Sequence, residues 1–207
     1  MARAAVGKVQ NVIFDLGGVV LDWNPDQLVA RFQPLPELQP QFKEAVFGHS
    51  DWQLFDRGTL TEPEMLKRME TRTGRPRREL LAVMDAVRDS LAEKPETVRL
   101  IRTLQARGIP LFCLSNMPET IYAHLRRRHS FWDAFQGIVI SSQVRMIKPE
   151  REVFVHLLDK FALQAEESVF IDDVAANVDA AKSVGMNAIW FRDAAQCQRD
   201  LERLWAA

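Results

Sequence analysis

The sequence predicts an α/β fold: a doubly wound parallel sheet forms the core, and a small helical segment is inserted after the first strand. Two observations carry this prediction. Five short apolar runs, most of them bounded by glycine or polar residues, are typical of strands buried on both faces. From about residue 95 onward, these runs alternate with helical patterns, which is the order expected of a doubly wound sheet.

The five predicted strands have the same character: three or four consecutive apolar residues without polar alternation. They lie at residues 12–14, 111–114, 138–140, 169–171 and 188–191. Between them, helices are predicted over residues 96–107, 150–161 and 177–184. The first and last of these are followed by Gly108 and Gly185, and glycine is a common residue just past the end of a helix.

Residues 25–92 read differently, because they contain several helical segments and no convincing strand. Thr61 followed by Pro63 and Glu64 is typical of a helix start. We therefore expect an α/β core built from residues 1–23 and 93–207, and a helical cap built from residues 24–92. Hinges between the two are expected near residues 22–24 and 94–95.

Composition excludes several classes of protein. The 207 residues include 27 Lys and Arg against 28 Asp and Glu, and a net charge of −1 argues against a nucleic-acid partner. No apolar stretch approaches the ~20 residues of a membrane helix, and no leader pattern opens the chain. Two cysteines, Cys113 and Cys197, make neither a disulfide framework nor a zinc site. We expect a cytoplasmic protein whose partner is a small molecule.

Polar residues stand where the predicted strands end, and ligands of open α/β sheets bind at that edge. These residues are Asp15, Ser115, Asn116, Lys148, Asp172 and Asp173. Carboxylates from two strands repel each other unless a cation compensates them, and Mg²⁺ prefers such oxygen ligands. A lysine and a serine suit a group with several negative oxygens. The sequence thus predicts a phosphate ester as substrate, with Asp15 as a nucleophile that forms an aspartyl-phosphate.

These residues lie in four motifs that together resemble those of the haloacid dehalogenase (HAD) superfamily of hydrolases, with its Rossmann-like core and helical cap. The motifs are residues 12–19 (VIFDLGGV), 114–116 (LSN), 148–149 (KP) and 170–177 (FIDDVAAN). Residues 52–58 and 142–150 also resemble bacterial phosphatases that act on glucose 1-phosphate. The chain is similar as well to the phosphatase domain of soluble epoxide hydrolases.

The resemblance implies a role for each site residue. Asp15 would be the nucleophile and a metal ligand, together with the carbonyl oxygen of Gly17 and the carboxylate of Asp173, whereas Asp172 would act on the metal through water. Ser115, Asn116 and Lys148 would hold the phosphate. Asn177 would either orient the acidic loop or cap a helix.

The sequence departs from the family pattern at Gly17, where most of these phosphatases have a second aspartate that serves as general acid and base. Glycine can neither donate nor accept that proton, so the role is vacant or filled from elsewhere. Because the anomeric oxygen of a sugar leaves readily, we interpret Gly17 as a clue to a sugar phosphate such as glucose 1-phosphate. Asp22, His49 and Asp51 are possible replacements, although each is expected to be a solvated surface residue. Trp52 is a candidate for lining the substrate pocket.

Two alternatives remain open. A 2-haloacid dehalogenase uses the same nucleophile without a metal, but such enzymes lack the paired acids of residues 172–173. A non-catalytic binding protein could have lost turnover together with the second aspartate, but Asp15, Lys148 and Asp173 would then have no chemical reason to persist. The sequence leaves the choice between monomer and dimer open.

Overall fold

The computed structural model describes residues 9–206. Residues 1–8, which the sequence analysis assigned to the core, lie outside the described residues. The expectation that no leader pattern opens the chain concerns these same residues. Within the described residues, no helix has both the length and the apolar character that crossing a membrane requires.

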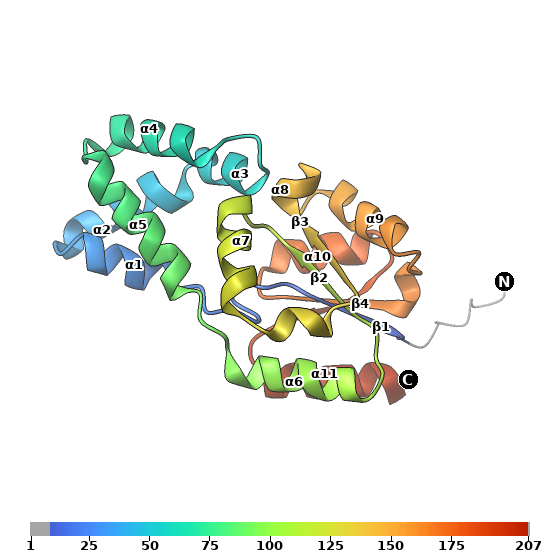
Figure 1. Cartoon of the computed structure of the whole chain (residues 1–207). Coiled ribbons are helices and arrows are strands. Elements are labelled where there is room, and N and C mark those ends of the chain that lie inside the picture. Colours follow the sequence, from blue (N-terminus) through green and yellow to red (C-terminus); the bar gives the residue numbers. More distant parts are fainter. Residues whose placement is uncertain (1–8, 207) are drawn as a thin grey trace.

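The core is a five-stranded sheet in which every neighbouring pair of strands is parallel (Figure 1). In chain order the strands are β1 (Asn11–Phe14), β2 (Leu111–Ser115), β3 (Gly137–Ile140), β4 (Ser168–Asp172) and β5 (Asn187–Trp190). Their order across the sheet is β3-β2-β1-β4-β5. This arrangement confirms the predicted fold class and all five predicted strands.

Helices cover both faces of the sheet, which is why its strands are continuously apolar. Alternate side chains of β1 divide between two clusters, with Val12 and Phe14 on one face and Ile13 on the other. The first face is covered by α6 (Pro95–Ala106), α7 (Glu119–Arg128) and α11 (Ala194–Ala206). The second is covered by α9 (Arg151–Lys160) and α10 (Ala175–Ser183). Polar residues therefore stay at the strand ends, where a site can form.

Shorter helical segments complete the core. They are η3 (Phe131–Ala134), α8 (Ser141–Val144) and η4 (Ala165–Glu167).

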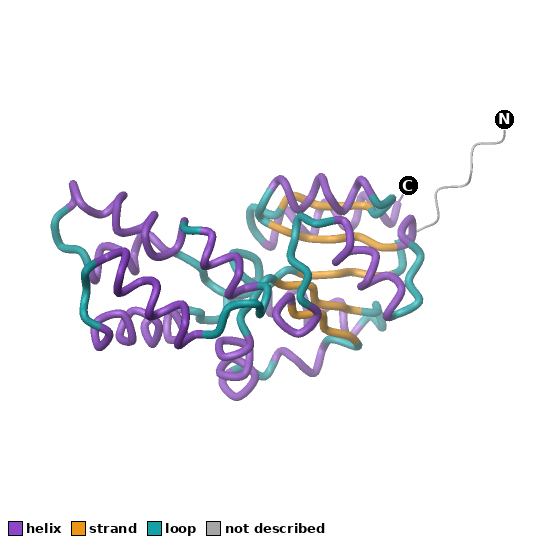
Figure 2. The backbone as a smooth tube through the Cα atoms, turned by 90° about the horizontal axis from the view of Figure 1, so that it is seen from above, coloured by secondary structure: helices purple, strands orange, loops and turns teal. Residues whose placement is uncertain are grey.

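Between β1 and α6, residues 25–90 form helical elements joined by short turns and lie to one side of the sheet (Figure 2). These elements are α1 (Pro25–Phe32), η1 (Pro36–Leu38), α2 (Gln39–Lys43), η2 (Glu44–Gly48), α3 (Ser50–Asp56), α4 (Glu62–Thr73) and α5 (Arg77–Ser90). The start of α4 has the predicted chemistry, because Thr61 and Glu64 form a reciprocal capping box. We call this helical segment the cap.

The end of α3 is fixed to the core by three contacts. Arg57 forms a bidentate ion pair with Glu150, with 2.9 Å between its Nη1 and Glu150 Oε2. Gly58 has a positive φ of 74°, and a Cβ there would lie 2.4 Å from the backbone oxygen of Ser142. The hydroxyl of Ser141 donates a hydrogen bond to the backbone oxygen of Asp56. The cap is therefore held against the carboxyl edge of the sheet at α3.

Asp51 is not the solvated surface residue that the sequence led us to expect. It is 3% exposed, and its two oxygens accept hydrogen bonds from Arg68 at 2.7 Å and Arg72 at 2.8 Å. Burial raises the pKa of Asp51, but the hydrogen bonds from the two arginines outweigh it and hold this pKa below its usual range. The pattern around residue 51 gave no sign of this, because its arginine partners lie on α4, 17 and 21 residues away.

Replacing Asp51 with Ala is expected to lower the free energy of unfolding by about 1–3 kcal/mol, because the charged groups of Arg68 and Arg72 lose their buried acceptor. Urea denaturation followed by tryptophan fluorescence measures the change. Asp26→Ala is the matched control, because Asp26 forms one exposed ion pair with Lys43 and should cost about 1 kcal/mol or less. Equal losses in the two variants would contradict the structural role of Asp51.

Candidate active site

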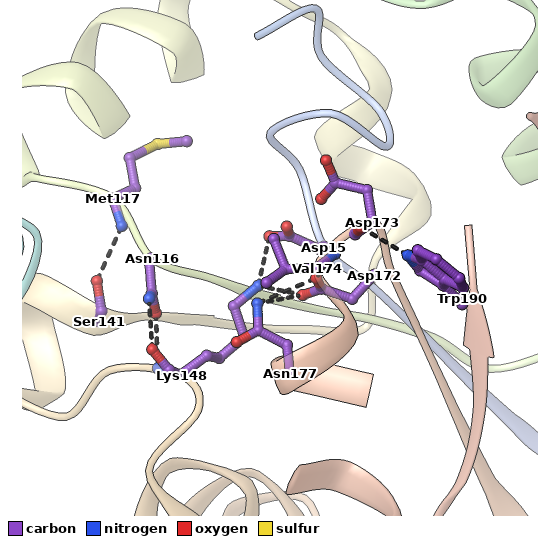
Figure 3. A network of polar contacts seen from close by, with 10 residues as sticks. All are labelled: Asp15, Asn116, Met117, Ser141, Lys148, Asp172, Asp173, Val174, Asn177 and Trp190. Atoms are coloured by element: carbon purple, nitrogen blue, oxygen red, sulfur yellow. Dashed lines mark hydrogen bonds and ion pairs between the residues drawn. The ribbon is translucent and has the colours of Figure 1, made fainter. Parts of the chain in front are cut away.

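The carboxyl ends of three strands and one loop bring the predicted site residues to the same place (Figure 3). A cavity of about 670 Å³ opens there between the sheet and the cap. Its floor is lined by Asp15, Gly17, Ser115, Asn116, Lys148, Asp173 and Asn177. Of the residues predicted to hold the metal or the phosphate, only Asp172 does not line the cavity, because it is fully buried beneath the floor.

Lys148 is the electrostatic centre of the floor. Its ammonium nitrogen lies 2.7 Å from Oδ1 of Asp15 and 2.7 Å from Oδ2 of Asp172 (Figure 3). All three side chains are buried. Burial lowers the pKa of Lys148, but the two carboxylates outweigh that effect and raise this pKa above its ordinary value. Lys148 therefore stays charged.

Asp172 organises the loop that follows β4. Its Oδ1 accepts a hydrogen bond from the backbone N–H of Val174 at 2.8 Å, and both of its oxygens accept from the side-chain amide of Asn177 at 3.0 Å. Of the two roles considered for Asn177, the structure shows the first, because its amide holds Asp172.

Asp173 lies at the edge of this floor, directly against the backbone of Gly18. Gly18 has a φ of 75°, and a Cβ there would lie 2.1 Å from Oδ2 of Asp173. Glycine is thus required at residue 18 for Asp173 to approach. Trp190 donates a hydrogen bond to the backbone oxygen of Asp173 at 2.8 Å and helps to fix the turn.

The three carboxylates form a group suited to a divalent cation. Asp15, Asp172 and Asp173 each offer an oxygen within 4.8 Å of the others. When all are ionised, Lys148 leaves an excess of two negative charges. Burial raises the pKa of Asp15 to about 7, with Lys148 opposing and Asp172 adding to the increase. Burial and the charge of Asp172 also raise the pKa of Asp173. The donor set therefore fits Mg²⁺, which prefers carboxylate oxygens and would neutralise this excess.

Asn116 connects the end of β2 to the lysine loop. Its side-chain amide donates to the backbone oxygen of Lys148 and accepts from the backbone N–H of Lys148, both at 2.9 Å. Ser115 is 2% exposed at the end of β2 and borders the same cavity. Contact of either residue with phosphate stays a prediction.

Opposite this charged floor, the cavity has an apolar wall. Trp23, Phe47 and Trp52 pack together, with ring centroids 5.0–6.0 Å apart. The sequence indicated Trp52 as a lining residue and missed Phe47. Apart from Val174 in the loop after β4, the remaining apolar lining residues are Pro25, Pro40, Val87, Leu91, Met117, Pro118 and Ile121. We call this set, together with the three aromatic residues, the apolar wall.

Asp56 also lines the cavity, from the last residue of α3. Nothing in the local sequence distinguished it, although it lies within the motif of residues 52–58. None of the replacements considered for the missing aspartate lines this cavity. Asp22 is exposed, and His49 and Asp51 border a separate hollow on the cap.

Known proteins resemble this chain in sequence and in fold. Residues 9–185 match the haloacid dehalogenase-like hydrolase family. The sesquiterpene phosphatase astK of Aspergillus oryzae is 29% identical over 194 residues, which cover 93% of this chain and 94% of that protein. The bifunctional epoxide hydrolase 2 of Rattus norvegicus is 39% identical over 70 residues, 34% of this chain and 13% of that protein.

Among solved structures, the fold matches that of a HAD family enzyme from Bacteroides thetaiotaomicron in complex with magnesium and inorganic phosphate. The TM-score is 0.73, the identity is 19%, and the match covers 89% of this chain and 94% of that one. The family match extends over most of the chain and includes every residue of the charged floor, so the protein is a hydrolase of the haloacid dehalogenase-like family.

Proposed function

We propose that this hydrolase is a Mg²⁺-dependent phosphatase of small phosphate monoesters and that it acts through an aspartyl-phosphate on Asp15. The observation that carries the proposal is the ammonium of Lys148, placed 2.7 Å from both Asp15 and Asp172 on the floor of a cavity that Asp173 also borders. A nucleophilic carboxylate beside a fixed cation suits attack on a phosphoryl group, whose own negative charge needs neutralising.

The residues divide the work between holding and reacting. An oxygen of Asp15 attacks phosphorus and displaces the alcohol, and water later attacks the same phosphorus to release Asp15 and inorganic phosphate. Lys148 neutralises charge on the transferring group, while Asp172 and Asn116 keep Lys148 in place. Ser115 is suited to donate a hydrogen bond to a phosphate oxygen.

Mg²⁺ would be held by Asp15, Asp173 and the carbonyl oxygen of Gly17, with Asp172 acting through water. When bound, it would supply positive charge that stabilises the transferring phosphoryl group. The sequence left metal-independent dehalogenation open as an alternative. The pair of acids at residues 172 and 173 is the reason to favour phosphate hydrolysis over it. The phosphatase astK and the magnesium–phosphate complex of the Bacteroides protein also support phosphate hydrolysis.

For the organic part of the substrate, the lining favours an apolar group. Lys43, Glu44 and Asp56 are the only charged residues that the cap contributes to the described lining, whereas eleven lining residues are apolar. The hydroxyls of a sugar need hydrogen-bonding partners, and this wall offers few. The name of the relative astK, a sesquiterpene phosphatase, points the same way. Glucose 1-phosphate stays the sequence-based prediction against which this candidate is tested.

Asp15→Asn is expected to reduce phosphate release by about 10⁴-fold or more while the fold is retained, because an amide cannot serve as the nucleophile. The measurement is inorganic phosphate released from alkyl and sugar phosphates, with Mg²⁺ and with EDTA, alongside circular dichroism. Release that survives EDTA or the Asn substitution would refute the proposed reaction.

Asp173→Asn is expected to raise the Mg²⁺ concentration that gives half-maximal activity by about 10- to 100-fold, because one negative ligand is lost. A Mg²⁺ titration of phosphatase activity measures the shift. Asp179→Asn, an exposed aspartate on α10, is the matched control and should not move the midpoint. Unchanged Mg²⁺ dependence in Asp173→Asn would argue against Asp173 as a ligand.

Trp52→Ala is expected to raise KM for an isoprenoid or hexyl phosphate by about 10- to 100-fold, because a large apolar contact is removed. KM for glucose 1-phosphate should change much less. The control is Leu54→Ala, an exposed residue of the same helix that does not line the cavity. If the wild-type protein turned over glucose 1-phosphate with a higher kcat/KM than hexyl phosphate, the apolar candidate would be rejected and the sugar prediction supported.

A further inference from the structure

The phosphatase reaction needs a proton for the departing alcohol and a base for the attacking water, and Gly17 supplies neither. We propose that Asp56, delivered from the cap at the end of α3, is the general acid and base of this site. The inference rests on the proposed function, because it assigns a role within the two half-reactions on Asp15.

Asp56 is held beside the cavity that contains the nucleophile. It lines the same cavity as Asp15 and Lys148. Its backbone oxygen accepts a hydrogen bond of 2.5 Å from Ser141, whose hydroxyl in turn accepts from the backbone N–H of Met117 at 2.8 Å. Arg57 and Gly58, the next two residues, make the ion pair with Glu150 and the close contact with Ser142. The backbone of Asp56 is therefore fixed by the core, not only by the cap.

The side chain of Asp56 has no structural partner. Among the described residues, no hydrogen bond or ion pair engages its carboxyl group, in contrast to Asp51 with two arginines and Asp172 with Lys148 and Asn177. A carboxyl group that lines a cavity without a structural partner is free to exchange a proton with a ligand there.

The surroundings of Asp56 favour its protonated form. Burial raises the pKa of Asp56 to about 8, the charge of Lys148 opposes the increase, and the charge of Asp15 adds to it. At neutral pH the group therefore carries the proton that a leaving alkoxide requires.

The proton balance closes over the two half-reactions. First, Asp15 bonds to phosphorus, the bond from phosphorus to the ester oxygen breaks, and that oxygen takes the proton of Asp56. The alcohol departs and leaves Asp56 as a carboxylate. Asp56 then takes a proton from water as the water oxygen bonds to phosphorus, and the bond from phosphorus to Asp15 breaks. Inorganic phosphate leaves, and Asp56 is protonated again.

The other carboxylate that the cap contributes to the cavity is a weaker candidate. Glu44 is exposed, and its carboxylate lies against Gly48 of its own turn, where a Cβ would stand 2.2 Å from Oε2 of Glu44. No contact links Glu44 to Lys148 or to the sheet among the described residues. Asp56 alone combines the cavity, a backbone fixed by the core and a free carboxyl group.

The test compares two phosphate esters in Asp56→Asn. Hexyl phosphate has a poor leaving group that needs a proton, whereas p-nitrophenyl phosphate releases an anion that is stable without one. Single-turnover release of hexanol should fall by about 10²–10⁴-fold. With p-nitrophenyl phosphate, the first turnover should stay near the wild-type rate and appear as a stoichiometric burst, followed by slow steady-state release because water is no longer activated.

Asp85→Asn is the matched control, since Asp85 is an exposed aspartate on α5 of the same cap, and it should leave both esters unaffected. The proposal would be overturned if Asp56→Asn turned over both esters at the wild-type rate. It would also be overturned if the first-turnover rate fell by the same factor for hexyl phosphate and for p-nitrophenyl phosphate. Failure of the proposed function would give a different result: the wild-type protein itself would show no phosphate release that depends on Asp15.

A second variant guards against a purely structural loss. A Cβ at Gly17 would meet no atom closer than 3.9 Å, in Trp23, and Gly17 does not have a positive φ, so the backbone there accepts a side chain without a clash at Cβ. Adding Gly17→Asp to Asp56→Asn should recover hexyl phosphate turnover by about tenfold or more. Recovery through a carboxyl group at a different position would show that the lost function is proton transfer.

Discussion

The ammonium of Lys148 between Asp15 and Asp172 is the interaction on which the rest of the site depends. Three carboxylates at the edge of a buried sheet would repel one another, and because Asp15 and Asp172 are buried, water screens their charges poorly. Lys148 compensates both at 2.7 Å. Asn116 fixes the backbone of Lys148, and Asn177 fixes Asp172, so polar contacts around the lysine serve to hold one buried cation in place.

The same loop also joins the core to the cap. Glu150 follows Lys148 by two residues and pairs with Arg57, which follows Asp56 directly. One short stretch of chain therefore positions the cation of the floor and anchors the helix that borders the cavity from above. Residues 52–58 and 142–150, far apart in sequence, thus form the two sides of one contact.

Much of this could be predicted from the sequence because it depends on local signals. Apolar runs gave the five strands, and the capping box of Thr61 and Glu64 marked the start of a helix. Parallel strands end at one edge, so Asp15, Ser115 and Asp173 could be expected near one another. What escaped prediction depends on packing between distant segments. The arginines that bury Asp51 come from another helix, and Asp56 reaches the cavity only because Arg57 and Gly58 fit the core.

The absence of a side chain at Gly17 has a consequence for the shape of the substrate. The position of a Cβ at residue 17 lies 3.9 and 4.0 Å from the Cβ and Cγ of Trp23, so any side chain at residue 17 would begin in contact with this tryptophan. With glycine at residue 17, no side chain of that residue covers Trp23, so an apolar carbon close to the phosphate can contact this tryptophan. The absence of a side chain at residue 17 thus leaves an apolar surface next to a highly polar reaction centre.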